Sequence, residues 1–258
     1  MDKSAIESLF SLEGRLAIVT GASRGIGWAL ADGLARAGAK VIALARSDAP
    51  EKPFSPNVRY HALDVSDATA IKSLLAASAA PSLDEKLVAG WPQTKLAVLV
   101  NAAGISIAGD DIDNFDRTIA VNLRAPWLMS RALAPLMAGG SIINVTSLGA
   151  FRGFPDNPAY IAAKGGLRQL TQSLAYDLGA QGIRVNNLVP GYIHTRMTDA
   201  SFNDPVKHQQ RAAQTMLGRW GEPGDLVGAA IFLASPASAY VTGQDIVVDG
   251  GWLAKGMV

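Results

Sequence analysis

The amino-acid sequence predicts an α/β protein: a doubly wound, Rossmann-like parallel sheet of about seven strands with helices on both faces. Short runs rich in β-branched residues or leucine recur along the chain and are typical of buried strands; they lie at residues 16–20, 41–44, 58–63, 96–100, 141–145, 184–188 and 246–248. Alanine- and leucine-rich stretches with helical spacing separate most of them, as at residues 28–37, 70–77 and 160–178. This alternation favours a parallel sheet covered on both sides.

The connections between these elements show turn and loop signals. Glycines close the helices, as at Gly38 and Gly182, where a left-handed residue is commonly required. Prolines at positions 50, 53 and 56 exclude regular structure from residues 47–57. We expect residues 47–57 and about 192–205 to be loops, and residues 192–217 to form a lid over the substrate.

The composition favours one large core and a small-molecule partner. Of 258 residues, 49% are hydrophobic and 17% are charged, against about 25% charged in ordinary soluble domains. We expect a single domain over residues 1–258, with residues 1–13 as an N-terminal lead-in and with a subunit interface. The formal net charge is +1, without a basic block, which argues against nucleic acid or an anionic membrane as partner.

The start of the chain and the missing cysteines narrow the options further. Residues 1–10 include Asp2 and Glu7 and lack the basic flank and apolar stretch of a signal peptide. No apolar run approaches the roughly 20 residues that span a bilayer, so we expect a soluble cytoplasmic protein. With no cysteine, and with His61 and His208 far from further ligands at suitable spacing, no metal site is expected.

A glycine-rich turn follows the first strand and opens a helix. The sequence at positions 20–27 is Thr-Gly-Ala-Ser-Arg-Gly-Ile-Gly. Glycines in this context allow a tight turn and a close approach of main-chain amides to a pyrophosphate, which the helix N-terminus also favours. We predict a dinucleotide site here. Its candidate residues are Gly21, Ser23, Arg24, Gly25, Ile26 and Gly27.

The end of the second strand indicates which dinucleotide binds. NAD sites usually place a carboxylate there, about 20 residues after the glycines. Here the strand ends in Ala45 and Arg46, and Arg46 together with Arg24 is suited to a 2′-phosphate. The sequence therefore favours NADP(H), with NAD as second choice; the alternative is that both arginines are ordinary surface residues.

Two further strand ends fit the same cofactor. Asp64 and Val65 end the third strand, where the carboxylate suits an adenine amino group and the valine suits the ring; alternatively, Asp64 opens the following helix. The fourth strand ends in Asn101-Ala102-Ala103-Gly104, where small residues would let a ribose approach the main chain. The candidates there are Asn101, Ala103 and Gly104.

A tyrosine and a lysine stand four residues apart at the start of the long helix. Because Tyr160 and Lys164 are at i and i+4, both project from one face. Ser147, just beyond the strand at residues 141–145, can meet them at the carboxyl edge of the sheet, where open α/β sheets bind ligands. Asn122 is a fourth candidate. Taken together with residues 20–27, 101–104 and 190–191, these positions resemble the short-chain dehydrogenase/reductase family in its compact single-domain form.

The resemblance covers nearly the whole chain and implies a catalytic set of Asn122, Ser147, Tyr160 and Lys164. Tyr160 would exchange a proton with the substrate while the nicotinamide carries hydride. A free tyrosine has a pKa near 10, and an ammonium group about 4 Å away supplies roughly 4 kcal/mol toward lowering it. The resemblance further implies that Lys164 binds the nicotinamide ribose, Ser147 the substrate oxygen, and Asn122 a water.

The segment after the sixth strand resembles the part of this family that meets the nicotinamide. Its candidate residues are Pro190, Gly191, Ile193 and Thr195. His194 in the same segment is an alternative base. The chain departs from the family at Ala102, where most relatives have a second asparagine.

The sequence does not identify the substrate. The loops at residues 148–157 and 192–217 combine aromatic and basic residues, which suits a substrate with an apolar part and a hydroxyl, ketone or carboxylate. Residues 243–252 look like the ending of relatives that act on sugars, sugar acids or 3-oxoacyl thioesters. Relatives are commonly tetramers, so we expect a homotetramer. The alternatives are a 3-oxoacyl-carrier reductase and a non-catalytic dinucleotide sensor.

Overall fold

The computed structural model describes residues 2–75, 82–91, 95–109 and 111–256. Its centre is a seven-stranded, all-parallel sheet in the order β3-β2-β1-β4-β5-β6-β7. The strands are β1 (Arg15–Thr20), β2 (Lys40–Ala45), β3 (Val58–Ala62), β4 (Lys95–Asn101), β5 (Ser141–Val145), β6 (Arg184–Pro190) and β7 (Asp245–Val248). The predicted fold class and all seven predicted strands are confirmed.

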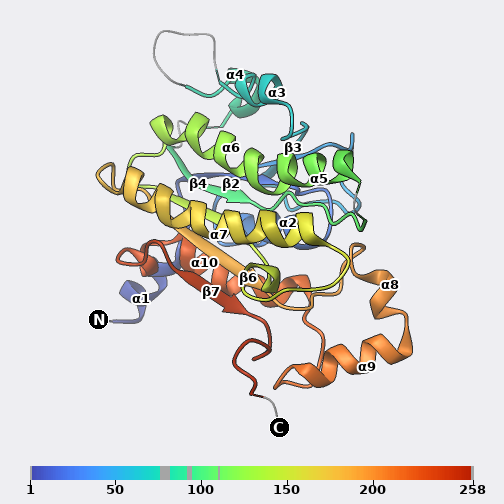
Figure 1. Ribbon diagram of the computed structural model, residues 1–258. Coiled ribbons are helices and arrows are strands. Elements are labelled where there is room, and N and C mark those ends of the chain that lie inside the picture. Colours follow the sequence, from blue (N-terminus) through green and yellow to red (C-terminus); the bar gives the residue numbers. More distant parts are fainter. Residues whose placement is uncertain (1, 76–81, 92–94, 110, 257–258) are drawn as a thin grey trace.

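Helices cover both faces of the sheet (Figure 1). On one face α2 (Gly25–Arg36) and α10 (Val227–Ala234) pack on the sheet. On the other face lie α3 (Ala68–Lys72), α4 (Glu85–Val88), α6 (Ala125–Leu133) and α7 (Pro158–Gly179). Alternation along β1 explains the two cores, since Ala17 and Val19 join the first and Leu16 and Ile18 the second.

The remaining helices lie at the edges of this plan. They are α1 (Lys3–Phe10), α5 (Ile112–Ile119), α8 (Asp199–Phe202) and α9 (Pro205–Gln214), with a π-helical turn, η1 (Ala120–Arg124), between α5 and α6. Short 3-10 turns are η2 (Ala134–Leu136), η3 (Leu148–Ala150), η4 (Pro223–Leu226) and η5 (Pro236–Ser238). None of the helices in the described ranges is both long and apolar enough to cross a membrane.

The helix boundaries differ from the sequence prediction at three places. α2 already begins at Gly25, because the glycine turn forms the first turn of the helix. α3 ends at Lys72, and positions 76 and 77 of the predicted helix fall outside the described residues. The segment predicted as a loop to about residue 205 contains α8, and α9 follows directly, with the Asp204 carboxylate accepting hydrogen bonds from the N–H groups of Val206 and Lys207.

A ladder of polar side chains crosses the sheet beneath α7. Asn101, Asn144, Asn187 and Asp245 occupy matching positions on β4, β5, β6 and β7. Asn101 donates to Asn144 at 2.8 Å, and Asn144 donates to Thr171 of α7 at 2.8 Å. Thr171 donates to Asn187 at 2.6 Å, and Asn187 donates to Asp245 at 2.8 Å. Because unpaired buried polar groups are costly, this ladder fixes how α7 lies on the sheet.

Candidate active site

Tyr160 and Lys164 lie on the same face of α7, as their spacing predicts. The Lys164 Nζ atom is 5.7 Å from the centre of the Tyr160 ring. Lys164 is almost fully buried and donates a hydrogen bond from Nζ to the main-chain carbonyl of Val145 at 2.7 Å. That carbonyl ends β5, so the first two turns of α7 are held at the carboxyl edge of the sheet.

Burial changes the acid–base behaviour of both side chains. Removal from water penalises the ammonium form and lowers the pKa of Lys164 to about 8. Burial likewise penalises the phenolate and raises the pKa of Tyr160, although a side-chain hydrogen bond with Ser147 opposes this. In the protein without cofactor, desolvation is the largest effect on the pKa of Tyr160 and acts against the lowering expected from Lys164.

Ser147 meets Tyr160 from the turn after β5. Its hydroxyl accepts a hydrogen bond from the Gly149 N–H at 3.1 Å and so begins η3. A Cβ at Gly149 would lie 3.6 Å from both Ser147 Oγ and Tyr160 Cε1, and 2.8 Å from the Ile161 side chain. Glycine at this position thus leaves room for the serine, the phenol and a substrate oxygen to come together.

Asn122 lies behind this group, in the π-helical turn η1. Its side-chain amide forms two hydrogen bonds with the main chain of Ile105, accepting from the N–H at 2.9 Å and donating to the carbonyl at 2.7 Å. A Cβ at Gly104 would lie 3.2 Å from Asn122 Oδ1 and 3.8 Å from Lys164 Nζ. The asparagine therefore holds the strand-end segment at residues 104–105 next to Lys164. Nothing in the local sequence signals this π-helical turn.

The glycine turn has the shape of a phosphate cradle. Gly21 has φ +68°, and a Cβ there would lie 2.6 Å from Ala103 Cα. A Cβ at Gly27 would collide with the main-chain carbonyl of Gly21. Gly25 begins α2 with φ +54°, so the free N–H groups of the first helical turn face the loop. These residues fit a dinucleotide pyrophosphate, which needs a close approach to main-chain amides.

Thr20 is a buried residue of this region that the sequence analysis did not single out. Its hydroxyl accepts hydrogen bonds from the N–H groups of Ala102 and Ala103, at 3.1 and 3.2 Å, and lies 3.4 Å from the carbonyl of Val100. It ties the end of β1 to the end of β4 beneath the cradle. The available signal was a threonine as the last strand residue before the first glycine.

The two predicted arginines differ in their surroundings. Arg24 forms an ion pair with Glu51 at 2.9 Å, and Glu51 also lies 3.6 Å from Arg196 of the lid segment. Arg46 is exposed just beyond β2 and makes no ion pair with any described residue. Glu51 comes from the loop at residues 47–57 and was not considered from the sequence. Thus Arg24, one of the two cations proposed to bind a 2′-phosphate, is already paired with an acidic side chain.

The side chains of the candidates at the ends of β3 and β4 form hydrogen bonds within the protein or are buried in it. Asp64 Oδ1 accepts hydrogen bonds from the N–H and hydroxyl of Ser66, at 2.8 and 2.7 Å, while Asp67 caps α3. The alternative that Asp64 opens that helix is therefore wrong. Val65 is buried in the core, and Asn101 is buried in the polar ladder. The side chains of Val65 and Asn101 therefore face the interior of the protein.

The segment after β6 packs against the cradle. A Cβ at Gly191 would lie 2.6 Å from Asp249 Cα, and Ile193 is buried. The Thr195 side chain approaches Gly25, since a Cβ there would lie 3.3 Å from Thr195 Cγ2. His194 stacks on Phe202, with ring centres 3.6 Å apart. Both nitrogens of that imidazole face carboxylates, Asp199 of the proposed lid at 3.3 Å and Glu222, just beyond it, at 3.8 Å.

Comparison with known proteins agrees with this arrangement. A family model described as enoyl-(acyl carrier protein) reductase matches residues 21–253. The chain is 36% identical to the 2-dehydro-3-deoxy-D-gluconate 5-dehydrogenase of Pseudoalteromonas atlantica, over 95% of this chain and 98% of that protein. It is 39% identical to the L-rhamnose 1-dehydrogenase (NAD(P)(+)) of a Sphingomonas species, over 93% and 96% of the two chains.

Solved structures show the same relationship. The crystal structure of a gluconate 5-dehydrogenase from Burkholderia cenocepacia, in complex with NADP and tartrate, superposes with a TM-score of 0.84 at 32% identity. The match covers 97% of this chain and all of the other. On the evidence of its sheet order, its glycine turn and these matches, the chain belongs to the short-chain dehydrogenase/reductase family of oxidoreductases.

Proposed function

We propose that this protein is an NADP(H)-dependent oxidoreductase that interconverts a carbonyl and a secondary alcohol on a sugar acid or related polyol, with Tyr160 as general acid and base. One observation carries the proposal: Ser147, Tyr160 and Lys164 meet at the carboxyl edge of the sheet, beside a glycine turn shaped for a pyrophosphate. A non-catalytic sensor of the dinucleotide would have no need of a proton donor at that place.

In this proposal each side chain has a separate task. The bound dinucleotide supplies or accepts hydride at its nicotinamide. In the reducing direction Tyr160 donates its phenolic proton to the substrate oxygen, and in the oxidising direction the phenolate takes that proton back. Ser147 donates a hydrogen bond to the same oxygen. Lys164, held by the carbonyl of Val145, keeps a positive charge beside the phenol, and Asn122 fixes the neighbouring main chain.

The cofactor assignment rests on charge at the end of β2. Ala45 and Arg46 stand where NAD sites usually have a carboxylate. Arg24 is a second cation at the start of α2, and the solved gluconate 5-dehydrogenase carries NADP. The main-chain N–H groups of the glycine turn would hold the pyrophosphate, and residues 190–195 would contact the nicotinamide. NAD is the second choice.

The substrate class is supported by the relatives and by the lid. Two of the relatives described above act on gluconate-type acids, and the solved one was crystallised with tartrate. The aromatic and basic side chains of residues 192–217, the proposed lid, suit a polyol that carries a carboxylate. The family model is named for an acyl-carrier reductase, so a 3-oxoacyl thioester reductase is the second candidate.

A substitution of Tyr160 tests the catalytic role. We expect Tyr160→Phe to lower kcat by about 10²- to 10⁴-fold, while fluorescence titration shows NADPH binding unchanged. Assays of wild-type protein with sugar acids, polyols, ketones and 3-oxoacyl thioesters, each with both cofactors, identify the substrate class. Turnover undiminished in Tyr160→Phe would overturn the proposed mechanism, and turnover confined to acyl thioesters would favour the second candidate.

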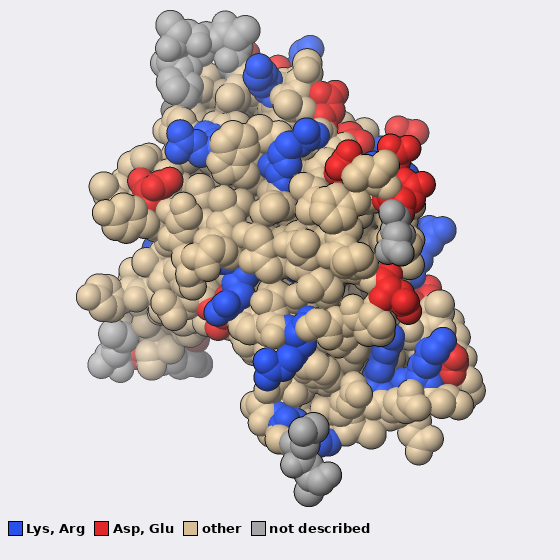
Figure 2. Space-filling view, in the orientation of Figure 1, with Lys and Arg blue, Asp and Glu red and all other residues tan. Residues whose placement is uncertain are grey.

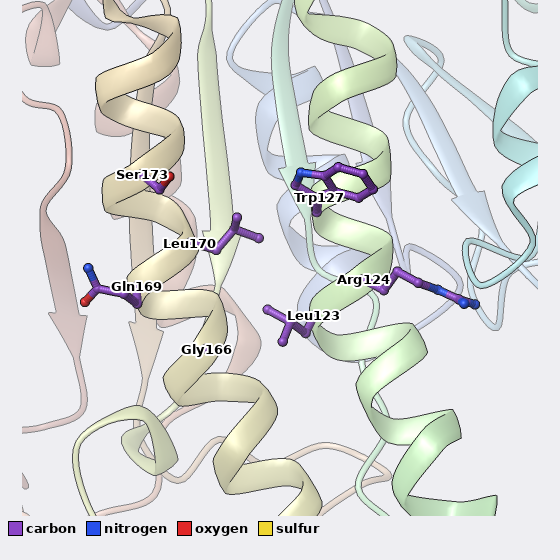
Figure 3. Close-up of a pocket in the computed structure, with 7 residues that line it drawn as sticks. All are labelled: Leu123, Arg124, Trp127, Gly166, Gln169, Leu170 and Ser173. Carbon is purple, nitrogen blue, oxygen red and sulfur yellow. The ribbon is translucent and has the colours of Figure 1, made fainter.

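We also propose a homotetramer, supported by an open apolar groove between α6 and α7. Figure 3 shows Leu123 and Leu170 approaching one another across this groove, with Trp127 on its rim. Small residues on α7 would permit close packing between subunits: Ala162, Ala163, Gly165 and Gly166. Ala162 is exposed, Gly165 has open space before it and Gly166 lines the groove, whereas Ala163 is fully buried within its own chain. We further propose that the protein is cytoplasmic, which cell fractionation tests. We also propose that residues 1–258 form one domain, which predicts a single cooperative unfolding transition.

A further inference from the structure

We propose that Arg211, on the face of α9 that packs against Tyr192 and Trp220, binds the carboxylate of the substrate and so selects acids over neutral polyols. The proposal rests on the proposed function, because it concerns the substrate of the same site. Neither the fold nor the chemistry of hydride transfer determines which side chain recognises a carboxylate on the substrate.

Three other cations near α9 are paired with carboxylates, whereas Lys255 of the C-terminal segment is exposed and donates to the main-chain carbonyls of Ala213 and Thr215. Arg196 lies 3.6 Å from Glu51, and Lys207 lies 3.3 Å from Asp204. Arg219 holds Asp225 through two hydrogen bonds, at 2.7 and 3.0 Å. Within the described ranges, Arg211 forms no ion pair with a carboxylate. It is therefore a half-buried guanidinium without a carboxylate counter-ion among the residues that the structure describes.

Two aromatic rings hold the Arg211 side chain in place. Its Cζ atom lies 4.7 Å from the centre of the Tyr192 ring and 5.7 Å from that of Trp220. The two rings pack on each other with centres 5.6 Å apart, and Trp220 is buried. A guanidinium that contacts aromatic rings retains N–H groups able to donate, and its fork matches a carboxylate. The side chain is thus restrained before any ligand binds.

This guanidinium contacts Tyr192, a residue of the segment that follows the carboxyl edge of the sheet. Tyr192 follows directly on Gly191 after β6, and β6 is the neighbour of β5, whose last carbonyl holds Lys164. Parallel neighbours end at the same edge of a sheet. From Tyr192 a line of aromatic contacts continues to Trp252, at 6.3 Å, and from Trp252 to Phe154, at 5.8 Å. Phe154 belongs to the segment that leads into α7 and Tyr160.

Basic side chains lie near α9. In Figure 2 Lys and Arg side chains appear over the lower part of the view, where Figure 1 places α9 and the C-terminal segment, and also over its upper part. Asp and Glu gather higher, toward α5. Arg152, on the other proposed substrate loop, also lacks a carboxylate partner among the described residues. It is exposed and donates only to the carbonyl of its neighbour Phe151, so it lacks the restraint that favours Arg211.

A matched pair of ligands tests the assignment. D-Gluconate and D-glucitol differ by a carboxylate against a hydroxymethyl group, and each is titrated by calorimetry into the enzyme–NADPH complex, in which gluconate is not oxidised. We expect wild-type protein to prefer gluconate. Arg211→Met should raise the Kd for gluconate by about 10- to 100-fold, the range of a charge-assisted hydrogen bond, and leave the Kd for glucitol unchanged. The Kd of Arg211→Lys for gluconate should lie between those of the wild-type protein and Arg211→Met.

Lys207→Met is the control, because Lys207 lies one turn away on α9 and is already paired with Asp204. It should leave both affinities unchanged. The proposal would be overturned if Arg211→Met kept the preference for gluconate, or if it lost affinity for gluconate and glucitol equally while still folded. Thermal unfolding of the variant shows whether it is folded.

The two proposals fail in different ways. If wild-type protein oxidises sugar acids but Arg211→Met leaves their affinity unchanged, only the Arg211 assignment falls. If gluconate binding depends on Arg211 but no sugar acid is turned over, only the proposed function falls. A wild-type protein that binds gluconate no better than glucitol would overturn both the acid preference and the role of Arg211.

Discussion

Lys164 donates its hydrogen bond to the carbonyl of Val145 while its Nζ atom lies within 5.7 Å of the Tyr160 ring. The ammonium group is thereby removed from water and held beside the phenol by a neutral main-chain acceptor. An acceptor of this kind fixes its position without neutralising its charge. The positive charge stays available to the phenolate, at the expense of folding stability.

The first prediction concerns the pH dependence of stability. The pKa of Lys164 is about 8 in the folded protein and 10.5 in the unfolded chain. Between these values the unfolded chain binds more protons, so the free energy of unfolding rises with pH across this window. Relative to Lys164→Met, wild-type protein should gain about 3 kcal/mol between pH 8 and pH 10.5. Urea unfolding of both proteins at several pH values measures this, and parallel profiles would show that Lys164 titrates normally.

The second prediction concerns Ser147. We expect Ser147→Ala to reduce kcat by about 10²- to 10³-fold, the effect of removing one donor to a developing oxyanion. Since its hydroxyl also accepts from the Gly149 N–H, the free energy of unfolding should fall by about 1 kcal/mol. Steady-state kinetics and denaturant unfolding separate the two effects. Loss of activity without any change in kcat, through KM alone, would contradict the proposed role.

The third prediction concerns Glu51. Its carboxylate pairs with Arg24 and would compete with a 2′-phosphate for that cation. Exposed ion pairs contribute up to about 1 kcal/mol, so Glu51→Gln should tighten NADPH binding by up to about fivefold. NADH binding should not change. Arg46→Asp is the opposite variant and should weaken NADPH alone. Fluorescence titrations measure the Kd of each variant for NADPH and for NADH. Equal changes in the two Kd values would contradict an effect specific to the 2′-phosphate.

The fourth prediction concerns the glycine cradle. Gly21→Ala places a Cβ 2.6 Å from Ala103 Cα, at a residue with positive φ. The turn must shift, and NADPH binding should be lost, with destabilisation of at least about 1–2 kcal/mol. Gly228→Ala is the control, since this exposed glycine of α10 has open space around it. It should stabilise the protein by about 0.5–1 kcal/mol and bind NADPH normally, as measured by unfolding and titration.

The fifth prediction concerns assembly. Trp127 is 45% exposed on the rim of the α6–α7 groove, and burying a charge in an interface is unfavourable. Trp127→Glu should therefore shift the protein from tetramer to smaller species in sedimentation velocity at micromolar concentration. Phe10, on α1, is 44% exposed, and Phe10→Glu should leave the sedimentation coefficient unchanged. A wild-type monomer at the same concentration would remove the proposed tetramer.

Strand positions and site residues could be predicted from the sequence because both depend on local patterns. Buried parallel strands require short runs of apolar residues, and Gly21 needs its positive φ whatever surrounds it. Lys164 follows Tyr160 by one helical turn, so their common face was fixed by spacing. The two lid helices were missed because α8 is four residues long and α9 carries mostly polar residues, which leaves little apolar periodicity to detect.

The sequence by itself thus determined the alternation of strands and helices, the cradle and the identity of the residues at the edge of the sheet. Only the tertiary structure decided which charges meet. The Arg24–Glu51 pair, the lowered pKa of Lys164 and the packing of the Arg211 guanidinium on Tyr192 all depend on segments distant in the chain. The physical reason is that desolvation and Coulomb interactions depend on distance and burial in space, whereas hydrophobic periodicity and backbone conformation are encoded over a few neighbouring residues.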